Sequence, residues 1–397
     1  MNNMYNDYKD LNENKELKSN IGNFKPIKAK KNNEKNGDLK KISFQNNKNL
    51  ILSIIMIVVL VLIIAGYFLF FNNKNNDTES NIEKNNSSSQ IESNTTENTK
   101  NVQIINVESK TRPYAIMINC HNAALPQSGV NNAYIVYELM VEGGITRMMA
   151  LFKDKDFDKV GSVRSARTQY LDYVYENDAI YVHAGGAQDA LNRIKDEKIN
   201  DIDVDGVYGV RDRSLNRAWE HTLFTNTSLL SQGLSDKKYR TTTEIKNILT
   251  YSADPINLDK FTTKLNANNI SIKYSDYRTS NYVYDSSKQM YLRSMNNTPN
   301  IDLVTNEQYA VKNIIVYGVK YSNYTYSGYS AYQKIDNIGQ GDGYYITNGY
   351  AIPITWEKSS KNGQTIYKYK ESGEGLVVND GNTYIQIYPT SGNLSIN

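Results

Sequence analysis

An uncharged, almost wholly apolar run of 22 residues, Leu50 to Phe71, constrains this chain more than any other feature. Such a run is long enough to cross a bilayer as one helix. About fifty polar residues precede it, whereas a signal peptide has a short leader, a shorter apolar core and a small-residue cleavage site. No cysteine lies near the run to carry a lipid. We therefore expect a transmembrane signal anchor; its length disfavours the alternative of a buried core helix.

The charges on either side of the run predict its orientation. Basic residues precede it and acidic residues follow it: Lys40, Lys41 and Lys48 on one side, Asp77, Glu79 and Glu83 on the other. Positive charge is retained on the cytoplasmic side of a membrane helix. We therefore expect a single-pass protein of the cell membrane, with a cytoplasmic N-terminus and everything after Phe71 outside the cell.

The segments that flank the run are polar. Residues 1–49 hold 11 Lys against six Asp or Glu and few bulky apolar residues, which predicts a disordered cytoplasmic tail. Residues 72–103 are rich in Asn, Ser, Thr, Glu and Lys, which predicts a flexible linker spanning roughly 30 Å. The net charge of the 397-residue chain is only +3, so we expect no nucleic-acid partner.

Residues 104–250 are expected to form an α/β ectodomain. Apolar runs at 114–118, 133–139, 148–152 and 179–183 indicate strands. Helical spacing of apolar residues follows the third run, at 170–175, and the fourth, at 187–194. An open sheet of this kind binds ligands at the carboxyl ends of its strands.

Residues 262–397 change character and are expected to form a mainly antiparallel β domain. Twenty of the chain's 32 tyrosines lie from Tyr251 onward. Asn348-Gly349 and Asp380-Gly381 are turn signals between its β-rich segments. Those segments are 281–285, 290–293, 311–319, 343–347, 352–356, 366–369 and 383–388. The predicted fold class is thus α+β overall, with an α/β N-terminal ectodomain, a β C-terminal domain and one preceding transmembrane helix.

Two arginines, Arg164 and Arg167, stand directly before the first predicted helix. Positive charge at a helix start opposes the helix dipole, which favours negative charge there. An anion held between the helix amides and both guanidinium groups would resolve the conflict. The alternative, which the sequence leaves open, is that these arginines pair with nearby acids: Glu142, Asp172 or Glu176.

A second strand-to-helix junction lies about twenty residues further on, and the two junctions could flank one crevice. The candidate anion-binding residues are therefore Arg147, Arg164, Arg167, His183 and the amides of Gly185 and Gly186. Catalytic residues cannot be assigned. We expect neither a cofactor nor a resident metal, because cofactor motifs are missing and the three histidines are far apart. Any divalent metal would need carboxylates, and Glu142 is the nearest candidate by sequence.

The only cysteine, Cys120, is followed by His121, a pair that suggests a thiol nucleophile. Neighbouring residues on a strand point to opposite faces, however, so a small packed residue is the better interpretation. Another cluster, Arg211, Arg213 and Arg217, is compatible with a phosphate clamp or with a solvated loop.

At these residues the chain resembles the YerB-type bacterial envelope proteins, a two-part domain family of unknown function. The resemblance covers most of residues 108–390. Members are often lipoproteins, whereas this chain has the apolar run instead, and Cys120 replaces a usual polar residue. The matching segments are 112–115, His121, 126–129, 141–147, 161–167, 178–186, the region around His221, 312–313, 339–345, 354–358 and 381–386.

A weaker resemblance, over about fifty residues, is to the LytR-CpsA-Psr phosphotransferases, whose arginines hold a lipid pyrophosphate. It rests on residues 159–167 and 181–186, and the later arginine-rich segment of that family has no counterpart here. Two hypotheses follow. The first is a non-enzymatic envelope protein that binds a cell-wall polymer or an envelope partner. The alternative is a phosphotransferase-like enzyme acting on lipid-pyrophosphate-linked glycans, so the sequence leaves open whether the protein is an enzyme.

Overall fold

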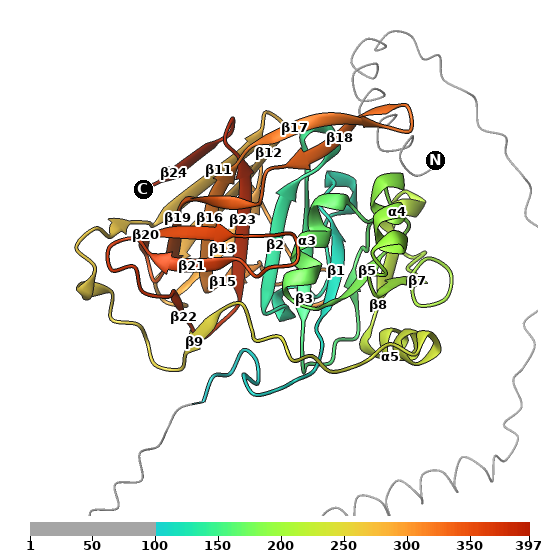
Figure 1. The fold of residues 1–397 in the computed structure, drawn as a ribbon, viewed down its shortest axis with the longest axis horizontal. Helices are drawn as coiled ribbons and strands as arrows, with labels where there is room; N and C mark the ends of the chain where they lie inside the picture. Colours follow the sequence, from blue (N-terminus) through green and yellow to red (C-terminus); the bar gives the residue numbers. More distant parts are fainter. Residues whose placement is uncertain (1–100) are drawn as a thin grey trace, which may run out of the picture. The chain divides into compact units, whose positions relative to one another are not determined.

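The computed structural model describes residues 101–397, so the predicted tail, apolar run and nearly all of the predicted linker lie outside the described residues. Within 101–397 no helix is both long and apolar enough to cross a membrane. The described chain is a mixture of α and β with strands predominating, and its C-terminal half is largely antiparallel (Figure 1).

The centre of the fold is an eleven-stranded sheet in the order β10-β20-β19-β16-β23-β2-β3-β1-β5-β6, with β21 paired to β20. Its strands are β1 (Tyr114–Asn119), β2 (Ile135–Met140), β3 (Thr146–Phe152), β5 (Ile180–His183), β6 (Asp201–Asp203), β10 (Leu265–Asn266), β16 (Asn313–Val319), β19 (Gly339–Thr347), β20 (Tyr350–Lys358), β21 (Ile366–Tyr369) and β23 (Thr383–Pro389).

Both predicted ectodomains contribute to this sheet. The C-terminal strand β23 lies between β2 and β16 and runs parallel to both, with Ile135 opposite Thr383 and Asn313 opposite the same residue. Strands β1, β5 and β6 are also parallel to one another. All six of these strands therefore end at one edge of the sheet, which we call the carboxyl edge; the opposite one is the amino edge.

A second, six-stranded sheet packs against one face of the central sheet in the C-terminal half. It comprises β11 (Asn269–Ser275), β12 (Arg278–Asp285), β13 (Met290–Met295), β14 (Thr298–Pro299), β15 (Ala310–Val311) and β24 (Asn393–Ile396). Smaller ladders are formed by β4 (Val160–Gly161), β7 (Val210–Arg211) and β8 (Leu223–Thr225), by β9 (Thr250–Ser252) with β22 (Val377–Asn379), and by β17 (Tyr321–Tyr326) with β18 (Tyr329–Ile335).

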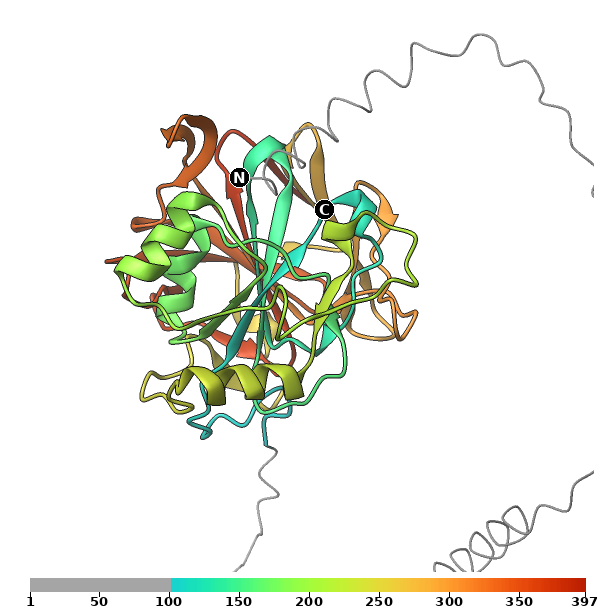
Figure 2. The ribbon, with the colours of Figure 1, turned by 90° about the vertical axis from the view of Figure 1, so that its right-hand side faces the viewer.

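Three α-helices cover the N-terminal half of the sheet: α3 (Thr168–Glu176), α4 (Gln188–Asp196) and α5 (Thr227–Lys237). Helices α3 and α4 share one face, and α5 packs on the other, where its Gly233 meets Ile202 of β6 (Figures 1 and 2). The 3-10 helices are η1 (Asn122–Ala124), η2 (Val130–Asn132), η3 (Glu142–Gly144), η4 (Trp219–His221) and η5 (Leu258–Lys260).

Successive side chains of a strand point to opposite faces of the sheet, so this sheet has a hydrophobic core on each face. On β1, Ala115 and Met117 pack with α3 and α4, while Ile116 and Ile118 pack on the opposite face. Because both faces are covered, these strands are continuous apolar runs rather than alternating ones. The tyrosines of the C-terminal half mostly pack inside the same cores, as Tyr282, Tyr317 and Tyr345 do.

The predicted strands and turns of both halves are found within four residues of their expected bounds, except that the run 311–319 divides into β15 and β16. The sequence analysis missed α5, which has a largely polar sequence and begins after its N-cap Asn226. It also missed the hairpin β17–β18. At the start of the described chain, the amides of Gln103 and Ile104 donate to the Asp380 carboxylate, which precedes β23 at the amino edge.

Candidate functional site

The predicted arginine stretch lies across the carboxyl edge, over the ends of β1 and β5. The Arg164 amide donates to the Met117 carbonyl at 2.9 Å, and the Ala184 amide donates to the Arg164 carbonyl at 3.1 Å. The Ala166 amide donates to the Gly185 carbonyl at 2.9 Å. These bonds hold the two predicted strand-to-helix junctions side by side; that they flank a ligand-binding crevice stays a prediction.

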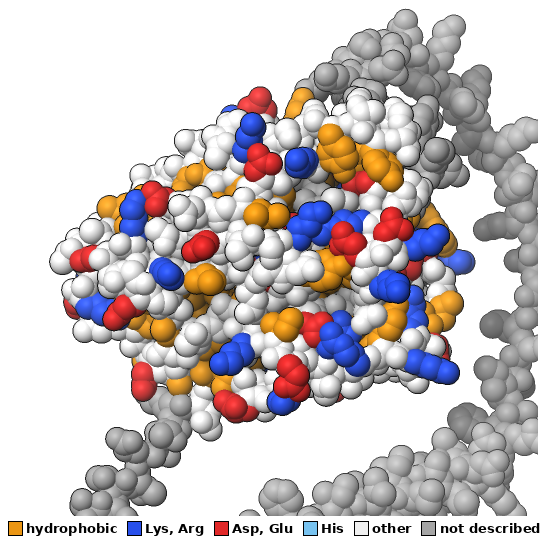
Figure 3. Space-filling view, in the orientation of Figure 1, with side chains coloured by type: hydrophobic (Ala, Val, Ile, Leu, Met, Phe, Trp, Pro, Cys, Tyr) orange, Lys and Arg blue, Asp and Glu red, His pale blue; other side chains and the backbone are white. Residues whose placement is uncertain are grey.

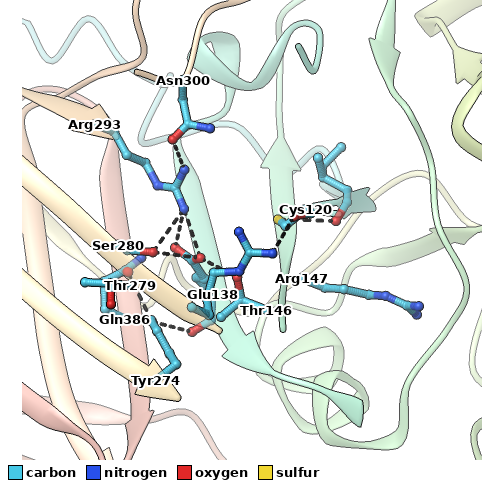
Figure 4. Close-up of polar contacts among 12 residues, drawn as sticks. Cys120, Glu138, Thr146, Arg147, Tyr274, Thr279, Ser280, Arg293, Asn300 and Gln386 are labelled. Atoms are coloured by element: carbon cyan, nitrogen blue, oxygen red, sulfur yellow. Dashed lines mark hydrogen bonds and ion pairs between the residues drawn. The ribbon is translucent and has the colours of Figure 1, made fainter. Parts of the chain in front are cut away.

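Two of the predicted arginines meet on one side of this stretch. Arg167 Nε lies 2.6 Å from the Glu142 carboxylate, and Arg147 Nη1 donates to the Ser165 carbonyl at 2.7 Å. Both guanidinium groups approach Tyr181: burial raises the pKa of this phenol, and the two positive charges partly oppose that effect. Figure 4 shows Arg147 extending away from the neighbouring Glu138–Arg293 network. We call Arg147, Arg167 and Glu142 the η3 subsite.

The third predicted arginine turns to the other side. Arg164 Nη1 donates to the carbonyl of Glu220 in η4 at 3.3 Å. The next residue, His221, stacks on His121, with ring centroids 5.1 Å apart and planes 8° from parallel. We call Arg164, His121 and His221 the η4 subsite. The sequence analysis noted both histidines but did not join them, because 100 residues separate them.

The remaining predicted residues, His183, Gly185 and Gly186, make hydrogen bonds and backbone contacts that hold the carboxyl edge together. His183 Nδ1 donates to the Gly185 carbonyl at 2.8 Å, and Nε2 lies 3.2 Å from the Asp201 carboxylate. Burial raises the pKa of Asp201, but the hydrogen bond and charge of His183, together with the charge of Lys237, outweigh burial and hold that pKa below its ordinary value. The Gly185 amide donates to the Asp203 carboxylate. Gly186 bridges to Ala166 alongside the arginine stretch.

The open alternative for the arginines, pairing with nearby acids, is confirmed in one case. Arg167 pairs with Glu142, whereas Asp172 pairs with Arg193 at 2.6 Å and Glu176 with Lys358 at 2.9 Å. Within residues 101–397 no group of three His, Cys, Asp or Glu side chains is arranged to hold a metal ion. Cys120 is fully buried, in agreement with the interpretation as a packed residue.

The sequence analysis missed the hairpin β17–β18, which lies above α4 at the carboxyl edge (Figure 1). Its Tyr324 hydroxyl donates to the Asp189 carboxylate, and its Tyr326 hydroxyl accepts from Asn192 at 2.7 Å. Tyr332 packs against both tyrosines at the centre of the hairpin. The Ser327-Gly328 pair between two tyrosine-rich segments was the local signal for this turn.

The surface charge is mixed rather than concentrated. On the face seen in Figure 3, Lys and Arg side chains alternate with Asp and Glu. Several exposed charges of the described residues pair, and one such pair is Lys370 with Asp342 at 2.6 Å. Arg147, Arg164 and Arg167 are instead buried, with only 2%, 4% and 3% of their surface exposed. These three arginines therefore contribute little to the surface charge.

Comparison with known proteins identifies this α+β molecule as a member of a two-domain family. The chain belongs to the family described as "Protein of unknown function (DUF3048)": the N-terminal domain matches residues 100–240 and the C-terminal domain matches residues 270–385. It is similar to YerB of Bacillus subtilis strain 168, whose name provisionally classes it as a lipoprotein. The identity is 29% over 290 residues, which cover 71% of this chain and 82% of that protein.

The crystal structure of B. subtilis YerB is also similar to this fold. The TM-score is 0.62 at 25% sequence identity, and the similarity covers 72% of this chain and 94% of the solved one. The two-part family expected from the sequence motifs is thus confirmed. The lipoprotein name of the relative associates the family with the cell envelope.

Proposed function

We propose that this protein binds an anionic polymer of the bacterial cell envelope at the carboxyl edge of its central sheet. The observation that carries the proposal is that Arg147, Arg164 and Arg167, from β3 and from the stretch before α3, all lie at one edge. Guanidinium groups bind phosphate and carboxylate oxygens through paired, charge-assisted hydrogen bonds. Parallel strand ends are also where α/β sheets present ligand-binding groups.

The start of the described chain and the three arginines lie at opposite edges of the central sheet. The described chain begins at the amino edge, where Asp380 holds the amides of Gln103 and Ile104. Strand β23 runs from that edge to the carboxyl edge over seven residues, or about 20 Å. The three arginines therefore lie at the opposite edge of the sheet from the first described residues.

The phosphotransferase alternative gains no support, and we do not propose it. None of the similar proteins has a name that specifies a reaction. Glu142, the carboxylate considered for a metal, is ion-paired with Arg167, and the Gly185 amide donates to Asp203. A protein partner in the envelope remains the second form of the binding hypothesis, and the lipoprotein name of YerB is compatible with it.

Co-sedimentation of the full-length protein, in detergent, with isolated bacterial cell wall tests the proposal. Wild type should bind saturably, and Arg167→Gln should weaken binding by about ten- to a hundredfold, since a charge-assisted contact contributes roughly 1.5–3 kcal/mol. Arg240→Gln is the matched control, because Arg240 pairs with Asp178 at the amino edge and is about half exposed.

Circular dichroism and thermal melting should show that both variants remain folded. Arg167→Lys, which keeps the charge but loses the paired geometry, should recover only part of the binding. Wild type that fails to saturate on the wall would overturn the proposal. Equal binding by folded Arg167→Gln and Arg240→Gln would overturn it as well.

A further inference from the structure

We infer that a cavity beside α3, separate from the carboxyl-edge arginines, binds an N-acetylated amino sugar of a glycan chain. The cavity has a volume of about 700 Å³, within the range of roughly 300–1,000 Å³ usual for small-ligand sites. Four segments line it: the last turn of α3, the C-cap of α4, the link between β18 and β19, and residues 359–362 between β20 and β21. None of its lining residues belongs to the predicted anion site, so the inference goes beyond the proposed function.

The cavity lies where the two domains of the family meet. Its residues from α3 and α4 belong to the N-terminal domain, whereas Ile338 and the loop 359–362 belong to the C-terminal one. Figure 1 shows the loop between β20 and β21 extending across to α3. Binding sites for small ligands occur preferentially at such interfaces. The sequence analysis did not propose this site, because only the folded chain brings its walls together.

Two buried carboxylates of α3, one helical turn apart, hold the walls in place. The first is Asp172, which accepts from Arg193 of α4 at 2.6 Å and from the Asn337 amide group at 3.0 Å. Asn337 directly precedes Ile338, so this bond fixes the link between β18 and β19 on the helix. The same carboxylate therefore positions two of the four segments.

The second carboxylate, Glu176, fixes the loop between β20 and β21. It pairs with Lys358 at 2.9 Å and accepts from the amide and the hydroxyl of Thr365 at 3.0 and 2.7 Å. These two partners flank the loop 359–364, so both of its ends are held on α3. A loop that is fixed before binding loses little further freedom when a ligand arrives.

The lining combines apolar surface with polar groups that have no other task. Tyr175 supplies an aromatic ring, and Ile338 is 47% exposed beside it. The side chains of Lys361 and Asn362 make no hydrogen bond or ion pair with the described residues 101–397. An apolar wall with a few polar groups that fix orientation is the usual composition of a ligand site.

The charges around the cavity nearly cancel. The C-terminal ends of α3 and α4, which carry partial negative charge, reach it. Glu197 lies 2.9 Å from Arg193 Nε and accepts from the Tyr175 hydroxyl at 2.9 Å. Burial raises the pKa of Glu197, but these two contacts and the charge of Lys361 hold that pKa below its ordinary value. The Lys361 ammonium group offsets the helix ends, so a neutral ligand is favoured over a phosphate.

An N-acetylated amino sugar is a neutral ligand that matches each part of this lining. Its C–H bonds suit the Tyr175 ring, its hydroxyls suit the polar loop, and its acetamido group offers a methyl to Ile338 and an amide to Asn362. A plain hexose lacks that group. Residues 359–362 are exposed, so the cavity is open to solvent and a glycan chain can continue beyond the bound unit.

Calorimetric titration of the full-length protein in detergent with equally long oligosaccharides of N-acetylglucosamine and of glucose tests the inference. The acetylated one should bind at least tenfold more tightly. Asn362→Asp removes the amide donors at an exposed position and should weaken that binding about three- to tenfold. Ile338→Asn should reduce the preference for the acetylated sugar. The matched control Asn266→Asp, on exposed β10 outside the cavity, should bind as wild type does.

Three results would overturn the inference. Wild type that binds neither oligosaccharide has no such site, and equal affinity for the two excludes recognition of the acetamido group. Wild-type affinity in both Asn362→Asp and Ile338→Asn would place the sugar outside the cavity. The proposed function fails separately: if Arg167→Gln and Arg240→Gln bind cell wall equally while the oligosaccharide results hold, the anion proposal is wrong and the glycan site stands.

Discussion

Glu138 on β2 and Arg293 on β13 form a fully buried ion pair, with Arg293 Nη2 2.9 Å from each carboxylate oxygen (Figure 4). The hydroxyls of Thr146 and Ser280 donate to the same carboxylate at 2.7 and 3.0 Å. The two partners lie in the two separate domains of the DUF3048 family. A buried pair of this kind links the central sheet to the second sheet.

A second buried pair performs the same task on the other face. Lys358 Nζ lies 2.9 Å from Glu176, which also accepts from the Tyr137 and Thr365 hydroxyls. Removing one partner of such a pair leaves a buried charge without its counter-ion. Together with the shared sheet, these contacts lead us to expect that the two halves unfold as one unit.

We first predict the effect of breaking the Glu138 pair. Arg293→Met should lower the free energy of unfolding by about 3–5 kcal/mol, because the buried carboxylate loses its counter-ion. Lys370→Met removes an exposed ion pair and should cost about 0–1 kcal/mol. Urea unfolding followed by fluorescence measures both. The double variant Glu138→Gln/Arg293→Met should cost less than the sum of the single changes, and a cost for Arg293→Met no larger than the control would contradict the prediction.

The same pair predicts how stability depends on pH. Burial raises the pKa of Glu138, but Arg293 and the two hydroxyls outweigh burial and hold that pKa below its ordinary value of 4.5. The folded-state pKa is thus lower than the unfolded one, so the stabilisation is complete above 4.5 and is lost as the pH falls through the folded pKa. The urea midpoint should fall more steeply with acidification in wild type than in Glu138→Gln. Parallel curves would show that this carboxylate contributes nothing to acid sensitivity.

Cys120 should be unreactive in the folded protein. Burial raises the pKa of its thiol to about 11, and the thiolate is the form that reacts. Labelling with a thiol reagent at pH 8 should be slower by about a hundredfold or more in the native protein than in guanidinium chloride. Since Cys120 is the chain's only cysteine, the readout has no competing signal. Rapid stoichiometric labelling of native protein would disprove its burial.

Because Cys120 should not react in the folded protein, introduced cysteines can test the predicted topology in intact cells. Cysteines introduced at Ser80 and at Ser19, on either side of the apolar run 50–71, should differ in labelling by a membrane-impermeant reagent. Ser80→Cys should react and Ser19→Cys should react only after the cells are permeabilised, because positive flanking charge stays in the cytoplasm. Equal labelling of the two, or labelling at position 19 alone, would reverse or refute the orientation.

The candidate site was predictable only in part, because local sequence patterns identify single stretches but not the contacts between distant residues. The stretch 161–167 was identified because two positive charges at a helix start conflict with a local rule, and the fold places that stretch at the carboxyl edge. Which partner each arginine contacts was not predictable from the sequence. Glu142 lies 25 residues from Arg167 and Glu220 lies 56 residues from Arg164, and only the folded chain brings them together. The His121–His221 pair had no sequence signal at all, since its spacing of 100 residues matches no motif.

The sequence by itself determined many local features of this protein: helices α3 and α4, the longer strands of the central sheet, the turns at Asn348-Gly349 and Asp380-Gly381, and the family. These follow from side-chain periodicity and backbone preferences over fewer than about twenty residues. Only the tertiary structure decided that β23 lies between β2 and β16, so that two sequence regions share one sheet. The pairing of Glu138 with Arg293 and the separation of Arg164 from Arg167 were decided at the same level. The physical reason is that strand order and buried charge pairing minimise free energy over contacts between residues 25 to about 250 positions apart, which no local pattern encodes.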